Sequence, residues 1–408
     1  MFVNTFWSLV PPIVAIGLAL LTKETYSSLF IGIVVGALLA TDFSPIGALD
    51  TIINDGLTAA IADNAGIFLF LVILGVMVAL VNATGGSAAF GRWAASHIHS
   101  KAGALLATFA LGVLIFIDDY FNCLTVGSVM TPVTDSQRIS RVKLAYLIDA
   151  TAAPICMIAP ISSWAAAVSG VAAKLDTGVS GIQLFIEAIP YNFYSLLTIV
   201  FVITMVVLGV DYGPMAAAEL KAAQTGDLGA LSEEQEEGSS RANMWDMLIP
   251  IILLIIFCVI GLIYVGGFWD PETNAGDFIA AFGDTDAFVG LPWGALIALV
   301  LSIIYLCARR VIIFKGAMGC MTKGFNAMVP AILILTFAVS LKSMTGLLGA
   351  ADYVEGLMKQ ASEGLFMLLP AIIFVVACLL AFATGTSWGT FGILIPIVLP
   401  IFNAAPDL

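Results

Sequence analysis

The chain has 408 residues, of which 61% are hydrophobic and 11% are charged, and its formal net charge is −13. Soluble domains carry about 25% charged residues, so a chain with this few charges cannot cover a soluble surface. The composition excludes a soluble enzyme, a disordered chain and a nucleic-acid-binding protein, and it indicates a polytopic protein embedded in a lipid bilayer.

Seven runs are apolar enough for us to expect a transmembrane helix in each. In chain order they are residues 6–21, 26–40, 65–81, 185–210, 245–266, 289–307 and 325–341. A chain of this length has room for roughly nine to twelve membrane elements. The remaining elements must therefore come from apolar stretches that carry polar interruptions.

The apolar stretch 103–133 is interrupted midway by Asp118, Asp119 and Asn122. Each flank has only about 12–15 residues, which give roughly 20 Å of helix and cannot cross a ~30 Å hydrocarbon core. We therefore predict a re-entrant helical hairpin with its polar tip at mid-membrane depth. Unwound backbone at that depth must be buried in protein or face water.

Two later stretches are interrupted as well. Residues 364–401 contain a polar run at 383–388, which predicts a second re-entrant hairpin. In residues 143–173 the prolines Pro154 and Pro160 predict breaks in one transmembrane helix, because proline removes a backbone donor. The predicted fold class is an all-α polytopic membrane protein with two re-entrant hairpins and at least one broken helix.

Lysine and arginine gather in three segments, residues 92–101, 138–143 and 309–323, whereas the loops 41–64 and 267–288 contain neither. Because cytoplasmic loops carry an excess of these residues, we expect the three basic segments to face the cytoplasm. That arrangement requires the first hairpin to enter and leave the membrane on one side. The expected localisation is the inner (cytoplasmic) membrane of the cell, with multiple spans.

Short similarities that recur in the same order predict that the two halves form an inverted repeat, as in many transporters. The run WSLVPPI at 7–13, for example, resembles WDMLIPI at 245–251. The predicted organisation is a first repeat over residues 1–210, an acidic cytoplasmic loop over 211–244 and a second repeat over 245–408. The second repeat has no broken helix after its hairpin. We therefore expect it to be incomplete at the C-terminus, by truncation rather than because another polypeptide supplies the element.

The tip of the first hairpin is a candidate site for ions and protons. The adjacent carboxylates Asp118 and Asp119 are costly in hydrocarbon unless they are paired, protonated or bound to a cation. A site that takes up a proton when empty and releases it when a cation arrives supports antiport. We expect Asp119 and Asn122 to be the inward-facing members. The alternative is that these acids only cap the ends of the half-helices.

The broken helix supplies a second set of candidate ligands. The set comprises Asp149, Thr151, Ser162 and Ser163. With carbonyl oxygens freed by Pro154, these side chains suit a hard cation such as sodium or lithium. We expect Asp119 and Asp149 to be the sodium ligands. The alternative is a proline kink with serines bonded back to their own helix.

The tip of the second hairpin offers hydroxyl groups without charge, from Thr384, Thr386 and Ser387, and Gly385 permits a helix break. A helix–helix contact of small residues is the alternative. The sequence has no Lys or Arg between residues 101 and 138, so a cationic transported species is favoured over an anion. We expect no enzymatic activity and no cofactor, only sodium ions and protons as transported species.

Three segments of the chain resemble the NhaC-type sodium/proton antiporter family of the ion-transporter superfamily. They are FIDDYFNCLTVGSVMTPVTD, ISRVKLAYLIDATAAPICMIAPISSWAA and ATGTSWGTFGILIPI. The resemblance implies exchange of sodium for protons, although some relatives exchange malate for lactate or export organic cations. It also implies a homodimer. The family's acidic tip, broken helix and second tip correspond to Asp118, Asp119 and Asn122, to Asp149, Thr151 and Pro154, and to Thr384, Thr386 and Ser387.

We therefore predict a secondary active transporter that exchanges sodium for protons by an elevator-like movement of the hairpins and the broken helix. The alternative within transport is a proton- or sodium-coupled antiporter of an organic cation or a carboxylate. A channel or a non-transporting membrane scaffold is the rival from another class. Three polar interruptions at one depth favour slow, saturable exchange over both rivals.

Overall fold

The computed structural model describes residues 2–22, 24–98, 100–116, 119–160, 162, 164–165, 168, 181–229, 241–350, 352–353, 363–384, 387, 390–391, 394 and 398. Every regular element in these residues is a helix, which confirms the all-α prediction for them. The chain divides into two compact units. Unit 1 comprises Met1–Ala65 and Val329–Leu408, and unit 2 comprises Gly66–Met328.

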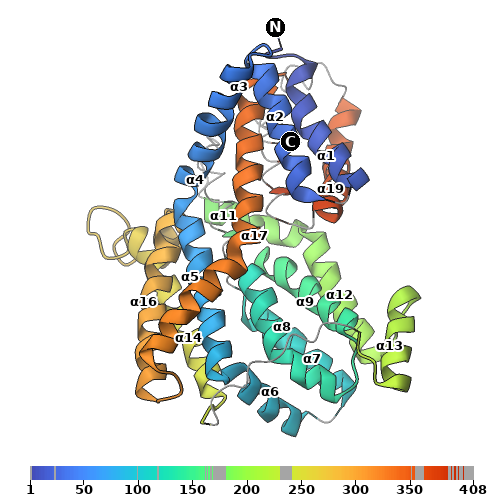
Figure 1. Cartoon of the computed structure of the whole chain (residues 1–408), viewed down its shortest axis with the longest axis vertical. Helices are drawn as coiled ribbons and strands as arrows, with labels where there is room; N and C mark the ends of the chain where they lie inside the picture. Colours follow the sequence, from blue (N-terminus) through green and yellow to red (C-terminus); the bar gives the residue numbers. More distant parts are fainter. Residues whose placement is uncertain are drawn as a thin grey trace. The chain divides into compact units, whose positions relative to one another are not determined.

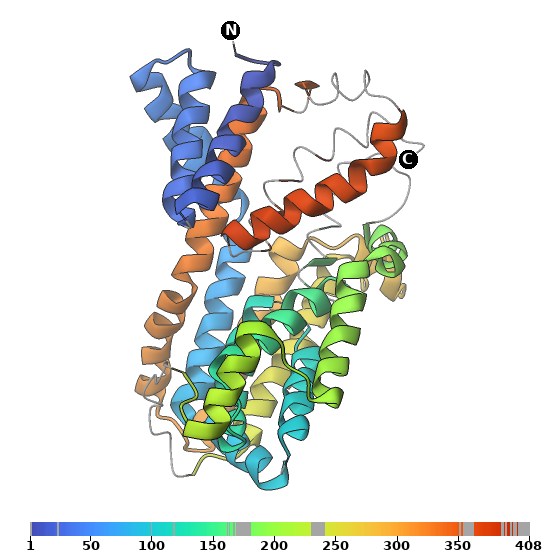
Figure 2. The same cartoon turned by 90° about the vertical axis from the view of Figure 1, so that its right-hand side faces the viewer.

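Unit 1 is built from short N-terminal helices and from C-terminal helices. Its elements are η1 (Phe6–Leu9), α1 (Val10–Thr22), α2 (Thr25–Ala40), α3 (Pro45–Thr51), η2 (Ile52–Thr58), α4 (Ala59–Asp63), the part of α17 (Phe314–Leu347) that follows Met328, and α19 (Glu363–Thr384). Helices α1 and α2 lie side by side (Figures 1 and 2). Their small and aliphatic residues, among them Ile33 and Ala37, share a buried core with Met344 of α17. Burial of apolar surface holds these short helices together.

Unit 2 contains the helices of the middle of the chain. They are α5 (Ala65–Thr84), α6 (Gly86–His97), α7 (Lys101–Leu114), α8 (Asp119–Ser136), α9 (Arg141–Cys156), α11 (Gly181–Ala188), η3 (Ile189–Tyr191), α12 (Phe193–Leu208), α13 (Gly213–Thr225), α14 (Trp245–Val265), α15 (Phe278–Gly283), α16 (Ala287–Ala308) and the first part of α17. Helices α7, α8 and α9 pack against one another, and α14 packs along α16 (Figure 1). A Cβ on Gly294 would lie 2.1 Å from the carbonyl oxygen of Phe257, so only glycine permits the close approach of α14 and α16.

Five helices in the described part of the chain are long and apolar enough to cross a membrane. They are Ala65–Thr84, Phe193–Thr225 (α12 followed by α13), Trp245–Val265, Phe288–Ala308 and Phe314–Leu347. Four of them cover all or nearly all of the runs predicted at 65–81, 245–266, 289–307 and 325–341. The runs predicted at 6–21 and 26–40 lie in the shorter apolar helices Phe6–Ala19 and Thr25–Ala40. The chain is thus a multi-pass membrane protein.

The run predicted at 185–210 holds a candidate span, but this span begins only at Phe193, so the helix is not continuous over the whole run. Helix α11 ends at Ala188, a short 3-10 turn contains Pro190, and α12 begins at Phe193. Pro190 removes a backbone donor, and the Asn192 side chain accepts a hydrogen bond from the Ser195 N–H, so a new helix starts there. After α12, Gly209 takes a left-handed conformation and separates this helix from α13.

The prediction that 41–64 is a loop is wrong. This segment forms α3, a π-helical turn η2, and α4. The start of α3 follows a standard helix signal, since the Ser44 hydroxyl accepts a hydrogen bond from the Gly47 N–H and Pro45 occupies the first turn. The absence of Lys and Arg bears on which side of the membrane this segment faces, but it does not predict the backbone conformation.

The interruption predicted within 103–133 is confirmed. Helix α7 ends at Leu114, α8 begins at Asp119, and the two helices pack against each other. The depth of this hairpin in a membrane stays a prediction. The second predicted hairpin, 364–401, begins with α19, which ends at Thr384. Its returning arm lies largely outside the described residues.

Candidate functional site

The interruption between α7 and α8 buries an acidic side chain. Asp119 occupies the first turn of α8, where the positive end of the helix dipole stabilises a carboxylate, and it is 6% exposed. Its neighbour Asp118, which the sequence singles out equally, lies outside the described residues. A carboxylate buried between helix ends is the kind of group that exchanges a proton for a cation.

Asn122, one turn further along α8, is fully buried and caps the end of α7. Its side-chain amide donates to the carbonyl oxygens of Gly112, at 2.6 Å, and Ile115, at 2.8 Å. The last carbonyls of a helix have no partner within it, so Asn122 satisfies two groups that the interruption would otherwise leave unpaired. The other end of the amide, Oδ1, is buried and accepts no hydrogen bond from the described part of the chain.

Thr151 of α9 lies at the same place. It is buried, and its hydroxyl donates to the carbonyl of Leu147 at 2.8 Å. A Cβ on Gly112 would lie 2.6 Å from the Thr151 Oγ1 and 3.8 Å from the Asn122 Oδ1. The absence of a side chain at Gly112 therefore lets α7, α8 and α9 bring Asn122 and Thr151 together. We call Asp119, Asn122 and Thr151 the buried polar cluster.

Asp149 does not belong to this cluster. It precedes Thr151 by two residues on α9, and residues two apart point to different sides of a helix. Consistent with this, Asp149 is exposed while Thr151 is buried. The structure therefore does not bring Asp149 together with Asn122, although the sequence pattern grouped Asp149 with the ligands.

Thr125 is a buried polar residue that the sequence reasoning missed. It follows Asn122 by three residues, the spacing that places side chains on one face of a helix, and this spacing could have revealed it. A narrow cavity beside α8 is lined by Met77, Val78, Val81, Asn82, Ser87, Thr125, Pro250 and Ile251. Ser87 donates to the Asn82 Oδ1 at 2.5 Å in its wall. The polar face of α8 thus extends from the buried polar cluster toward α5 and α6.

The broken helix differs from its prediction. Helix α9 continues through Pro154 and ends at Cys156, so Pro154 is not a break, because the preceding turns and the packing of α9 hold it in the helix. The chain bends at Pro160 instead. The Ser162 hydroxyl donates to the Cys156 carbonyl at 2.6 Å and accepts from the Ala165 N–H at 3.1 Å. Ser162 therefore joins the end of one helix to the start of the next turn.

Several predicted site residues are not described by the structure. Ser163, Gly385 and Thr386 lie outside the described residues, and of Thr384 only the backbone, at the end of α19, is described. Ser387 is partly buried. In the part of the chain that the structure describes, no group of three or more His, Cys, Asp or Glu side chains could hold a metal ion. The candidate cation ligands are therefore oxygens of single acids, amides, hydroxyls and carbonyls.

Ion pairs fix the other ends of α7 and α9. Glu219 of α13 is buried, accepts a hydrogen bond from the Ser140 N–H at 2.7 Å, and pairs with Lys101 at the start of α7. One buried acid thus links α7, α9 and α13.

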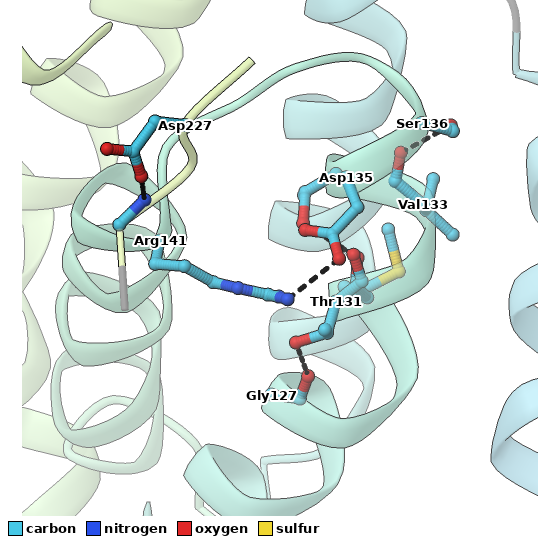
Figure 3. Close-up of polar contacts among 10 residues, drawn as sticks. Gly127, Thr131, Val133, Asp135, Ser136, Arg141 and Asp227 are labelled. Atoms are coloured by element: carbon cyan, nitrogen blue, oxygen red, sulfur yellow. Dashed lines mark hydrogen bonds and ion pairs between the residues drawn. The ribbon is translucent and has the colours of Figure 1, made fainter. Parts of the chain in front are cut away.

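A second ion pair lies nearby. The buried Lys143 Nζ donates to both carboxylate oxygens of Asp211, at 2.7 and 2.8 Å. Figure 3 shows Arg141 extending from α9 toward Asp135 at the end of α8, where the two are paired at 2.7 Å. These contacts hold the turn between α8 and α9 against the segment that follows α12. They therefore support the buried polar cluster from the opposite ends of α8 and α9.

Known proteins similar to this chain place it in a functional context. The Na+/H+ antiporter family model matches residues 155–405, which is more than half of the chain. An uncharacterized protein of Haemophilus influenzae is 33% identical over 423 aligned residues, covering 100% of this chain and 80% of that protein. The family match contains Ser162 but starts after Asp119, Asn122 and Thr151. The assignment of the buried polar cluster therefore rests on its own geometry.

Proposed function

The chain belongs to the Na+/H+ antiporter family, and from this premise we propose that it exchanges sodium ions for protons across the membrane at the buried polar cluster. The observation that carries this assignment is a helix interruption at which the buried Asp119 lies three residues before Asn122, whose buried Oδ1 accepts no hydrogen bond from the described part of the chain. Interrupted helices in transporters bind ions at mid-membrane depth.

The proposed chemistry is competition between a proton and a sodium ion for one carboxylate. With no cation bound, a buried carboxylate takes up a proton, because burial penalises its charged form. A sodium ion reverses this preference, since it supplies the opposite charge and accepts oxygen ligands. Asn122 and Thr151 would add uncharged oxygens to the coordination of the ion.

The finer features of this proposal rest on the sequence pattern and on the resemblance. We assign the chain to the NhaC type, with an inverted repeat, two re-entrant hairpins and an elevator-like movement of the hairpin segments. We place it in the inner membrane with residues 92–101, 138–143 and 309–323 in the cytoplasm, in agreement with the positive-inside rule. A homodimer belongs to the same set of proposals.

The test is transport by Asp119→Asn in everted membrane vesicles. We expect this variant to abolish the sodium-dependent collapse of a preset pH gradient, because an amide cannot exchange a proton. Asp50→Asn, which removes an exposed acid in α3, is the matched control and keeps wild-type exchange. Unchanged exchange in Asp119→Asn would refute the assignment of this carboxylate. A pH response that requires an added organic solute would favour the alternative of an organic substrate.

A further inference from the structure

Helix α13 and the residues on either side of it lie across one end of α7 and α9. We call residues 211–229 the strap. Asp211 pairs with the Lys143 Nζ at 2.7 Å, and the Leu228 carbonyl accepts a hydrogen bond from the Arg141 N–H at 2.8 Å. Lys143 and Arg141 both belong to the first turn of α9. The two ends of the strap are therefore anchored to the same helix.

The middle of the strap reaches a different helix. Glu219 accepts a hydrogen bond from the Ser140 N–H at 2.7 Å and pairs with Lys101, the first residue of α7. The buried residues of α13 are Glu219 and Ala222, so little apolar surface holds this helix in place. The Lys101 side chain is 41% exposed, and water therefore screens the ion pair. The contact with α7 can break while the anchors on α9 remain.

Glycines in left-handed conformations lie at both ends of α13. Gly213 has a φ of +56° and Gly226 has a φ of +72°. A Cβ on either glycine would meet no atom of the described residues within 4 Å, so neither position is held by packing. Because glycine changes backbone conformation at little steric cost, α13 can turn as a rigid helix between these two positions.

Helix α7 covers the buried polar cluster. A Cβ on Gly112 would lie 2.6 Å from the Thr151 Oγ1, and the Gly112 carbonyl accepts a hydrogen bond from Asn122. Asp119, Asn122 and Thr151 are at most 6% exposed, so an ion reaches them only when a covering helix moves. Since α7 begins at Lys101, the strap holds one end of a helix that covers the cluster.

We propose that the strap keeps the buried polar cluster closed and that Lys101 is a positioning residue for exchange. With the Lys101–Glu219 pair formed, α7 stays against α8 and α9. Breaking the pair frees the start of α7, whereas Asp211 and Leu228 keep the strap on α9, so the pair can form again. This inference rests on the proposed function, because it concerns the access of sodium ions and protons to the cluster.

The first test is the sodium dependence of exchange in everted vesicles, whose outer face carries Lys101 and meets the added sodium. Lys101→Gln removes the ion pair. The apparent affinity of a site scales with the fraction of molecules in which it is open, so we expect the KM for sodium to fall about two- to fivefold without loss of maximal rate. Lys101→Arg keeps the charge and should keep the wild-type KM.

Lys221→Gln is the matched control, because it removes an exposed ion pair, with Asp227, that lies within the strap. It should also keep the wild-type KM. An unchanged or raised KM in Lys101→Gln would overturn the proposal. A KM that falls equally in Lys221→Gln would overturn it too, because the effect would then come from lost surface charge.

The second test does not depend on transport. Hydrogen–deuterium exchange of the purified full chain in lipid nanodiscs, measured by mass spectrometry, follows the backbone amides of α7. Local opening exposes such amides, so residues 104–112 should exchange about two- to fivefold faster in Lys101→Gln than in the wild type and the two control variants. The amides of α14 and α16 should exchange at the wild-type rate. Wild-type exchange in α7, or faster exchange in all of these helices, would contradict the proposal.

The two tests separate this inference from the proposed function. Faster amide exchange in α7 of a chain without sodium-dependent antiport would refute the proposed function and leave the role of the strap in holding α7. Antiport that Asp119→Asn abolishes, with the KM and the α7 amides of Lys101→Gln unchanged, would refute the role of the strap alone.

Discussion

Replacing Asn122 by alanine tests how the interruption between α7 and α8 is stabilised. The change removes the donors that Gly112 and Ile115 receive at 2.6 and 2.8 Å. Both residues are buried, so water does not replace the lost bonds. A buried polar group without a partner costs about 1–3 kcal/mol, and two such carbonyls give a loss of about 2–6 kcal/mol in the free energy of unfolding.

The assay is chemical unfolding in detergent, with Thr134→Val as the matched control. Thr134 is also buried on α8, but its hydroxyl donates to the Met130 and Thr131 carbonyls of its own helix. Loss of such a local bond costs about 1 kcal/mol. If Asn122→Ala were no less stable than Thr134→Val, the argument that Asn122 caps α7 would be refuted.

A second variant, Asn122→Asp, distinguishes the effect of the side-chain donors from the effect of the side-chain oxygen. The ionised carboxylate keeps an oxygen at the position of Oδ1 but cannot donate to Gly112 and Ile115. We expect it to lose stability like Asn122→Ala while its unfolding temperature still rises with added sodium. In Asn122→Ala the rise should be smaller than in the wild type, because a bound ion stabilises only the folded state that holds it. Equal sodium responses in the wild type and in both variants would remove Oδ1 from the proposed site.

Three further predictions concern the surroundings of the cluster. Gly112→Ala should destabilise the protein by about 1–3 kcal/mol in the same unfolding assay, because its Cβ would lie 2.6 Å from the Thr151 Oγ1, and wild-type stability would contradict the close approach. Lys143→Met should lower the free energy of unfolding by about 3–5 kcal/mol, because it leaves Asp211 without its partner. The double variant Lys143→Met/Asp211→Leu should regain most of this loss. A double variant as unstable as Lys143→Met would argue against the pair. Glu219→Leu should destabilise the protein by about 1–3 kcal/mol in the same unfolding assay, because it removes the buried acceptor of the Ser140 N–H and the partner of Lys101. Wild-type stability would count against this acid as the link between α7, α9 and α13.

The sequence predicted those features that depend on local length and periodicity. The interruption near Asp119 follows from flanks too short to cross a bilayer, and the structure has it between Leu114 and Asp119. Helix ends beside proline are harder to place. Proline disfavours a helix but does not forbid one, and α9 runs through Pro154, whereas Pro190 does separate α11 from α12.

Contacts between distant segments could not be predicted in this way. Glu219 appears in sequence as one acid of a polar helix, and only the fold brings it to Lys101 and Ser140. Similarly, Arg92 and Arg309 served in the sequence as markers of sidedness. Their convergence on one pocket depends on the packing of α6, α14 and α16, for which a single sequence carries no signal.

Capping and ion binding at Asn122 are not competing explanations. The amide has two ends, and the described structure uses only its donor end, on Gly112 and Ile115. Those two bonds fix the plane of the amide and therefore the direction of Oδ1, which is the orientation that an ion ligand needs before the ion arrives. A variant such as Asn122→Ala removes the cap and the oxygen together, so loss of transport alone cannot distinguish the two roles. Only a change that removes the donors and keeps the oxygen, as Asn122→Asp does, separates the contribution of the cap from that of the ligand.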